Sequence, residues 1–221
     1  MSTEAAPQVK ICGITRIEDA LSCVRCGADA LGFVFFPKSP RCVSVETTKA
    51  IISRLPKTVT TVGVFVDASF NHIKRSVETC GLDAVQLHGR ESPEMVRRLG
   101  AENLIVIKTL FSKRPPYIDE MLDFDASAVL AECGRGDLPG GNALAWNWSE
   151  AGRLNRHHPL ILAGGLTPEN VRQAVRDAQP DAVDVSSGVE LLPGRKNPEK
   201  IKAFVERVRD VRVLSPKKIF G

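Results

Sequence analysis

Two stretches near the end of the chain decide the fold: LAGGLTP at residues 162–168 and DVSSGVE at residues 184–190. Each one joins a short apolar run to a turn rich in glycine, serine or threonine. In (β/α)8 barrels, the turns after the seventh and eighth strands commonly hold a phosphate group. An open, doubly wound sheet would instead place a G-x-G-x-x-G turn after its first strand, and this sequence has no such turn there. The late turns therefore favour a closed barrel.

Apolar runs of strand length recur along the rest of the chain, as expected of parallel strands that are buried on both faces. The predicted strands are Val9–Cys12, Ala30–Phe36, Thr60–Val66, Ala84–Leu87, Leu104–Lys108, Ala128–Glu132, Pro159–Ala163 and Ala182–Ser186. Predicted helices between them include Ile17–Arg25, Val45–Arg54, Ser92–Leu99, Thr167–Asp177 and Pro198–Val208. Eight strands alternating with about eight helices predict an α/β protein, a single-domain (β/α)8 TIM barrel over residues 1–221 with its core at about 9–208.

Three local details accompany this prediction. Thr15 is the expected N-cap of the first helix, because its hydroxyl can accept a backbone N–H. Pro168 is expected at the first position of the helix at 167–177, where its missing N–H costs nothing. Residues Leu214–Gly221 are expected to form a tail after the last helix.

Composition excludes several classes of protein. The chain has 221 residues, 43% of them hydrophobic, and 30 basic against 26 acidic residues give a formal charge of +4. This balance does not indicate nucleic-acid binding, whereas a slight positive excess suits a small anionic substrate. Six cysteines form no zinc-binding pattern, so we expect no metal. With neither a secretory signal nor an apolar stretch of the ~20 residues that cross a membrane, we expect a cytoplasmic protein with free thiols and no membrane partner.

Polar residues at the predicted strand ends are the candidates for chemistry, because barrel enzymes use that end. Lys10 and Cys12 share one side of the first strand, and Asp184 on the neighbouring eighth strand is the natural partner for an interior Lys10. Cys12 is a candidate base or nucleophile if a cation or dipole lowers its pKa, although many such cysteines are inert. Glu132, at the end of the sixth strand, is a candidate general acid or a carboxylate that caps a loop.

Further candidates lie on the other loops. Arg41, like Lys38 before it, follows the second strand and offers a planar fork for a carboxylate or phosphate, unless the turn is simply solvated. His88 follows the fourth strand and is a weaker candidate, because a lone histidine at a strand end is more often a packed polar residue than a catalyst. The two late turns together predict one phosphate site made of backbone N–H groups and hydroxyls. Its predicted members are Gly164, Gly165, Ser186, Ser187 and Gly188.

These motifs, taken in order, resemble the phosphoribosylanthranilate isomerase family from about Val9 to Val208. The resemblance is carried by KICGIT at 10–15, GFVF at 32–35, SPR at 39–41 and VGVF at 62–65. It continues with VQLHG at 85–89, AGGL at 163–166 and DVSSGVE at 184–190. Each motif alone could occur by chance, but the whole set in this order is specific.

The resemblance implies an Amadori rearrangement of N-(5′-phosphoribosyl)anthranilate in tryptophan biosynthesis, with no metal or redox cofactor. It implies that Cys12 is the general base, that Arg41 holds the anthranilate group and that Asp184 lines the site. The late glycine and serine turns would hold the phosphate. The resemblance leaves open whether the chain is a monomer or a homodimer.

The sequence departs from the family at the general acid. Members usually have Leu-Leu-Asp at the sixth strand end, followed by Gly-Gly-Thr/Ser-Gly and then Phe-Asp-Trp. In the same order, this chain has LAE at 130–132, GGNA at 140–143 and WNW at 146–148. Glu132 aligns with the aspartate and is the expected acid, with Asp137 in reserve. Glutamate has a similar pKa, ~4.3 against ~3.9, but is longer by one C–C bond of about 1.5 Å. The role of Trp146 and Trp148, in the substrate pocket or in packing, stays open.

Two other functions remain possible at this point. One is a different enzyme on a related phosphate-binding barrel, such as an epimerase, a thiamine-phosphate synthase or an indole-glycerol-phosphate synthase. The KICG and SPR motifs argue against it, because we do not associate that pair with those enzymes. The other is a binding protein that kept the phosphate site and lost the acid, and the changed loop after the sixth strand is its only support.

Overall fold

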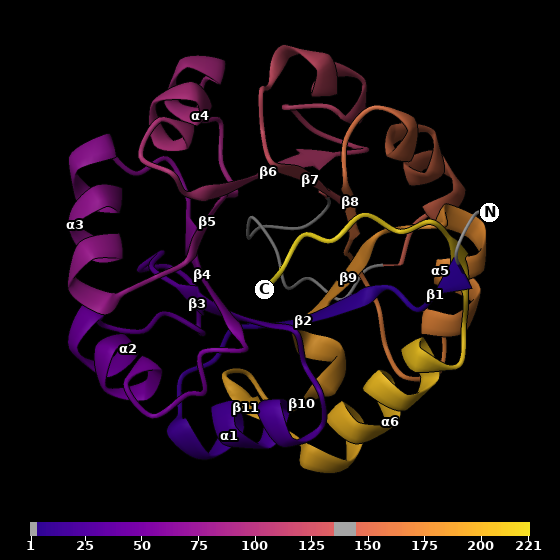
Figure 1. Ribbon diagram of the computed structural model, residues 1–221, viewed down its shortest axis with the longest axis horizontal. Coiled ribbons are helices and arrows are strands. Elements are labelled where there is room, and N and C mark those ends of the chain that lie inside the picture. The colour runs from indigo at the N-terminus through magenta and orange to yellow at the C-terminus, as the bar shows by residue number, and fades with distance from the viewer. Residues whose placement is uncertain (1–3, 135–144) are drawn as a thin grey trace.

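Eight parallel strands close into a barrel in the computed structural model of the chain, which describes residues 4–134 and 145–221. Neighbouring strands pair in sequence order, and the last pairs with the first, so the barrel has no free edge (Figure 1). The strands are β2 (Gln8–Cys12), β3 (Ala30–Val34), β4 (Thr60–Phe65), β5 (Ala84–Leu87), β6 (Ile105–Phe111), β7 (Ala128–Glu132), β8 (Leu160–Leu162) and β9 (Ala182–Val185). All eight predicted strands are confirmed, with ends that differ by a few residues.

A ring of helices surrounds the barrel (Figure 1). The α-helices are α1 (Ile17–Arg25), α2 (Val45–Ile52), α3 (Phe70–Cys80), α4 (Pro93–Gly100), α5 (Val171–Ala178) and α6 (Pro198–Arg209). Short 3-10 helices follow β6, β7 and β9: η1 (Ile118–Asp123), η2 (Trp148–Arg156) and η3 (Ser187–Val189). The expectation of about eight helices therefore needs correction, since the helical connections after β6 and β7 are 3-10 rather than α.

Two helix starts also differ from the prediction. The N-cap of α1 is Arg16 and makes no side-chain cap. The Thr15 hydroxyl donates instead to the Gly194 carbonyl, at 2.6 Å, and so joins the first loop to the last. The helix expected from residue 167 begins at Val171, because Asn170 closes a preceding turn by accepting the Thr167 N–H at 2.8 Å.

The amino-terminal end of the barrel repeats one arrangement four times. An aspartate or serine before every second strand accepts the backbone N–H of the preceding strand, and the next residue is an alanine that faces the barrel interior. The four pairs are Asp29-Ala30, Asp83-Ala84, Ser127-Ala128 and Asp181-Ala182. Because alanine side chains are short, this end of the barrel has room for another group.

The last residues of the chain fill that room. Phe220 is 1% exposed and packs with Ile219 among the interior alanines. The Gln8 side chain donates to the Phe220 carbonyl at 2.8 Å and accepts the Ile219 and Phe220 N–H groups. β12 (Val213–Leu214) pairs with β1 (Glu4–Ala5), and the chain then crosses the barrel (Figure 1). The expectation of a tail at 214–221 was wrong, because these residues close the barrel floor.

No helix in the described ranges 4–134 and 145–221 is long and apolar enough to cross a membrane.

Candidate active site

The predicted site residues converge on one cavity at the carboxyl ends of the strands. Side chains alternate along each strand, so every second residue faces the barrel interior and the last of them reaches the mouth. Among the residues that line the cavity are Cys12, Arg41, Glu132, Gly164, Gly165, Asp184, Ser186 and Ser187. Gly188 lies behind the wall instead. A side chain there would collide with the Leu166 carbonyl, so this glycine allows the β8 and β9 turns to touch.

Lys10 and Asp184 form a buried ion pair beneath the cavity floor, as the sequence predicts. Lys10 Nζ lies 2.8 Å from Asp184 Oδ1, and the two residues are opposite each other in the β2–β9 ladder. The Lys10 side chain is fully buried, while the Asp184 side chain is 10% exposed. Burial alone would lower the pKa of Lys10, but Asp184 and Cys12 outweigh it and raise the pKa, so the ammonium stays charged.

Arg41 is held by a second buried ion pair. Its Nε and Nη2 atoms donate to the two carboxylate oxygens of Glu190, at 2.9 and 2.7 Å. Lys196 donates to the same carboxylate at 2.9 Å and to the Ser186 carbonyl at 3.2 Å. The bidentate pair fixes the guanidinium plane and uses two of its three nitrogens. Nη1 is therefore the group with which Arg41 can meet an anion in the cavity.

The sequence analysis missed the roles of Glu190 and Lys196. Glu190 begins β10 (Glu190–Leu192) and Lys196 ends β11 (Arg195–Lys196), an antiparallel pair that follows β9. Glu190 belongs to the DVSSGVE motif, which gave a signal for its importance but not for its partner. Lys196 lay in no recognised motif, and only the return of this hairpin brings it to the Glu190 carboxylate that also holds Arg41.

Glu132 lies beside His88 inside the mouth of the barrel. His88 Nε2 is 3.1 Å from Glu132 Oε2, a close contact whose angle falls short of a hydrogen bond. The other ring nitrogen, Nδ1, lies 2.9 Å from Gln86 Nε2 and 3.1 Å from Thr109 Oγ1. Because the Gln86 amide and the Thr109 hydroxyl can donate to Nδ1, the proton is directed to Nε2, facing the carboxyl group. His88 thus belongs to the site more firmly than the sequence indicated.

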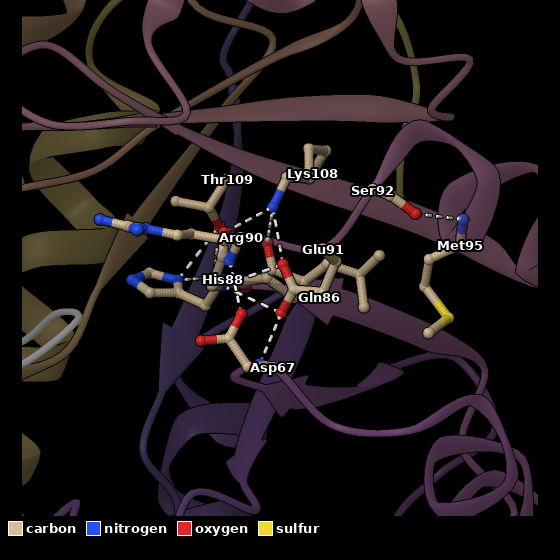
Figure 2. Close-up of polar contacts among 11 residues, drawn as sticks. Asp67, Gln86, His88, Arg90, Glu91, Ser92, Met95, Lys108 and Thr109 are labelled. Carbon is tan, nitrogen blue, oxygen red and sulfur yellow. Dashed lines mark hydrogen bonds and ion pairs between the residues drawn. The ribbon is translucent and has the colours of Figure 1, made fainter.

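A buried cluster shown in Figure 2 holds the loop that carries His88. Lys108 Nζ is 2.7 Å from Glu91 Oε2 and donates to the Gly89 carbonyl at 2.8 Å. Glu91 accepts the N–H groups of Gly89 and Asp67, at 3.0 Å each. Asp67 in turn accepts the Arg90 N–H at 2.6 Å. With both side chains of the ion pair at most 2% exposed, β6 and the loops after β4 and β5 are fixed together.

The β8 and β9 turns present polar groups to the cavity. Gly164 and Gly165 have φ angles of 87° and 68°, which favour glycine. The Ser186 hydroxyl is buried and has no hydrogen-bond partner among the described residues. The indole N–H groups of Trp146 and Trp148 donate to the carbonyls of Ala163 and Gly164, at 2.9 and 3.2 Å. Both tryptophans therefore brace the β8 turn.

Asp137 and the GGNA stretch at 140–143 lie outside the described residues. Among the residues that are described, no group of three or more histidine, cysteine or acidic side chains is placed to hold a metal ion.

A closed parallel barrel with its polar side chains gathered at this end is the architecture of a (β/α)8-barrel enzyme. The family model described as N-(5′-phosphoribosyl)anthranilate (PRA) isomerase matches residues 9–207. The chain belongs to this family. It is an aldose–ketose isomerase of tryptophan biosynthesis.

Individual relatives agree. The N-(5′-phosphoribosyl)anthranilate isomerase of Desulfatibacillum aliphaticivorans is 46% identical over 97% of this chain and 99% of its own. A crystal structure of monomers generated from the dimeric Thermotoga maritima isomerase has a TM-score of 0.82 and 39% identity, covering 93% of this chain and 100% of that one. A phosphoribosyl anthranilate isomerase in complex with reduced 1-(o-carboxyphenylamino)-1-deoxyribulose 5-phosphate has a TM-score of 0.81 and 40% identity, with the same coverage.

Proposed function

We propose that Cys12 is the general base and Glu132 the general acid of the isomerisation. The observation that carries this proposal is that the thiol and the carboxyl group, from the first and sixth barrel strands, line the same cavity as the glycine and serine turns. A substrate whose phosphate lies in those turns would extend its ribose between the two groups. Both residues are below 10% exposed, so bulk water is largely kept away from the reacting atoms.

Glu132 and Cys12 each carry out one of the first two proton transfers. Glu132 donates a proton to the ribose ring oxygen as the bond from that oxygen to C1′ breaks, and the amino nitrogen supplies the electrons of a protonated Schiff base. Cys12 then removes the proton from C2′, the C–H electrons form the C1′–C2′ double bond of an enol, and the electrons of the C1′=N bond return to the amino nitrogen. When C1′ gains a proton and the C2′ hydroxyl loses its own, the enol becomes the C2′ ketone. Substrate and product contain the same number of hydrogen atoms, so the reaction is an internal redox reaction that consumes no external oxidant or reductant.

Charged groups orient the two ends of the substrate. We assign the phosphate to Gly164, Gly165, Ser186 and Ser187, because they offer backbone N–H groups and an unpartnered hydroxyl on adjoining turns. The relative that binds a reduced product analogue carries a ligand with the same phosphate and carboxyl groups. We assign the anthranilate carboxylate to Arg41, whose Nη1 is not committed to Glu190.

The decay of phosphoribosylanthranilate fluorescence tests these assignments. The wild type should turn the substrate over, while Cys12→Ala should lose at least about a hundredfold in kcat. The same variant should bind inorganic phosphate and the product as the wild type does, because the turns are untouched. Wild-type rates in Cys12→Ala would overturn the choice of base. Binding without turnover in the wild type would indicate the binding protein that the changed loop first suggested.

The assembly and cellular location are also proposals. We propose a monomer or a homodimer, the two states named for the Thermotoga maritima isomerase, and light scattering on the purified chain distinguishes them. We propose a cytoplasmic location, since all six cysteines are free thiols, as a reducing compartment maintains. The interactions expected are with a small phosphorylated substrate rather than with nucleic acid.

A further inference from the structure

Lys10 carries a buried charge, and protein stability alone does not explain why a charge lies there. Its ammonium group lies inside the barrel, fully shielded from solvent, and pairs with Asp184 at 2.8 Å. Removing two charges from water carries a large desolvation cost, and apolar residues of similar size often stabilise a protein as well or better. Such a pair therefore suggests a task in the site above it.

The Lys10 ammonium group and the Cys12 thiol border the same gap, which is left by Gly32. Lys10 and Cys12 point to the same side of β2, and Gly32 lies opposite Cys12 on β3. A side-chain carbon at Gly32 would lie 2.8 Å from Cys12 Sγ and 3.2 Å from Lys10 Nζ. Both atoms thus border one small space, which any other residue at this position would fill.

We propose that Lys10 is a positioning residue that supplies the positive charge for the Cys12 thiolate, and that Asp184 holds the ammonium group in place. The inference rests on the proposed role of Cys12 as the base. When Cys12 loses its proton, Lys10 lies beside the new negative charge. When Cys12 receives the C2′ proton, Lys10 returns to its pair with Asp184 alone. The proton on Lys10 itself does not move.

Three charged groups act on Cys12, and their signs differ. Burial has the largest effect and leaves the pKa of Cys12 above its usual value, while Lys10 and, from β11, Lys196 act to lower this pKa and Asp184 to raise it. Lys196 is already bound to Glu190 and to the Ser186 carbonyl, whereas Lys10 lies two residues from Cys12 on the same strand and borders the same space at Gly32 as the thiol. Lys10 is therefore the cation that offsets the cost of placing a thiolate in a buried site.

Lys10 lowers the pKa of Cys12 and Asp184 raises it, so removing the two charges one at a time should shift this pKa in different directions. An ion pair with a purely structural role would not show this difference. The experiment measures the alkylation rate of Cys12 by iodoacetamide against pH, read peptide by peptide with mass spectrometry. Lys10→Met should raise the apparent pKa of Cys12 by at least about one unit, which slows alkylation at pH 7 about tenfold. Asp184→Asn should lower the pKa or leave it in place. Exposed Cys42, in the same digest, should react equally in all variants.

Two further measurements keep the outcome decisive. Buried Cys23 reports on folding, because its peptide should stay unreactive in every variant that is compared. If Lys10→Met alone is poorly folded, Lys10→Met/Asp184→Asn is compared with Asp184→Asn, and the pKa should still rise. In kinetics, Lys10→Met should lower kcat more than it raises KM, and Lys10→Arg should restore part of kcat.

Two results would overturn the inference. One is an unchanged Cys12 profile in folded Lys10→Met, and the other is a shift of the same sign in Lys10→Met and Asp184→Asn. Because alkylation reports on the thiol without substrate, it separates this inference from the proposed mechanism. Full activity of Cys12→Ala would remove the mechanism, while the alkylation profiles would still show whether Lys10 acts on the thiol.

Discussion

Replacing Glu132 with glutamine tests the proposed acid at the position where this chain departs from its family. Glutamine keeps the length and shape of the side chain but cannot donate the proton that opens the ribose ring. General acid catalysis contributes about 10²- to 10⁴-fold in rate. We therefore expect Glu132→Gln to lower kcat by at least about a hundredfold, which corresponds to about 2.7 kcal/mol or more in the activation barrier.

Glu132→Asp provides the matched comparison, because it restores the acid usual in the family without any change in the backbone. Glu132 Oε2 lies 3.1 Å from His88 Nε2, and the shorter side chain withdraws the carboxyl group by about 1.5 Å. The carboxyl group then loses contact with His88 and falls short of the ~2.6–3.2 Å reach that proton transfer needs. We expect a loss of about tenfold or more in kcat, smaller than that of Glu132→Gln because a proton donor remains.

Both variants are assayed by the decay of phosphoribosylanthranilate fluorescence, with kcat and KM determined separately. KM should change by less than about threefold, since the phosphate turns are untouched and the lost interaction belongs to the transition state. A Glu132→Gln enzyme within tenfold of wild-type kcat would refute the assignment and move the search to Asp137. A large rise in KM with an unchanged kcat would make Glu132 a binding residue.

Three further predictions concern stability. Phe220→Ala should lower the free energy of unfolding in urea by about 3 kcal/mol, because it empties the barrel floor. The control Leu214→Ala changes a side chain that is 64% exposed and should alter this free energy by less than about 1 kcal/mol. Equal effects of the two variants would contradict a packed floor. Lys108→Met should cost about 3–5 kcal/mol by leaving Glu91 buried without its cation, and adding Glu91→Gln should recover part of that loss. Burial raises the pKa of Glu190, but its two cationic partners outweigh burial and hold this pKa below the usual value. The contribution of the Glu190 carboxylate to stability is therefore present above about pH 4.5 and is lost as the pH falls through the lower, folded-state pKa. Acid titration of the wild type against Glu190→Gln should show a steeper loss in the wild type, and parallel curves would refute the coupling.

The strands were predictable because each is a short apolar run buried on both faces, and β2 to β9 all follow this rule. The helix ends were less predictable. Thr15 has the right chemistry for an N-cap, but the Gly194 carbonyl, far away in the sequence, competes for its hydroxyl at 2.6 Å. The residues at 214–221 were expected to form a tail, because a sequence does not show that four interior alanines leave space for Phe220.

The candidate site also has contacts that the sequence predicted and contacts that it did not. Strand alternation placed Lys10 and Cys12 on one side, and barrel closure predicted Asp184 as the partner of Lys10. Nothing local indicated that Glu190 would hold Arg41 or that His88 would lie 3.1 Å from Glu132. These pairs join residues on different strands and loops, and their distances depend on loop paths that no residue pattern specifies.

The sequence by itself determined the number and order of the strands, the end of the barrel that carries the chemistry and the residue types gathered there, because periodicity and motif order are local properties. Only the tertiary structure decided how charge is arranged around those residues. Closing the barrel brings β9 against β2, so a lysine that would be costly alone meets its aspartate beneath the thiol. Electrostatic interactions depend on distance and burial, and both quantities exist only once the chain has folded.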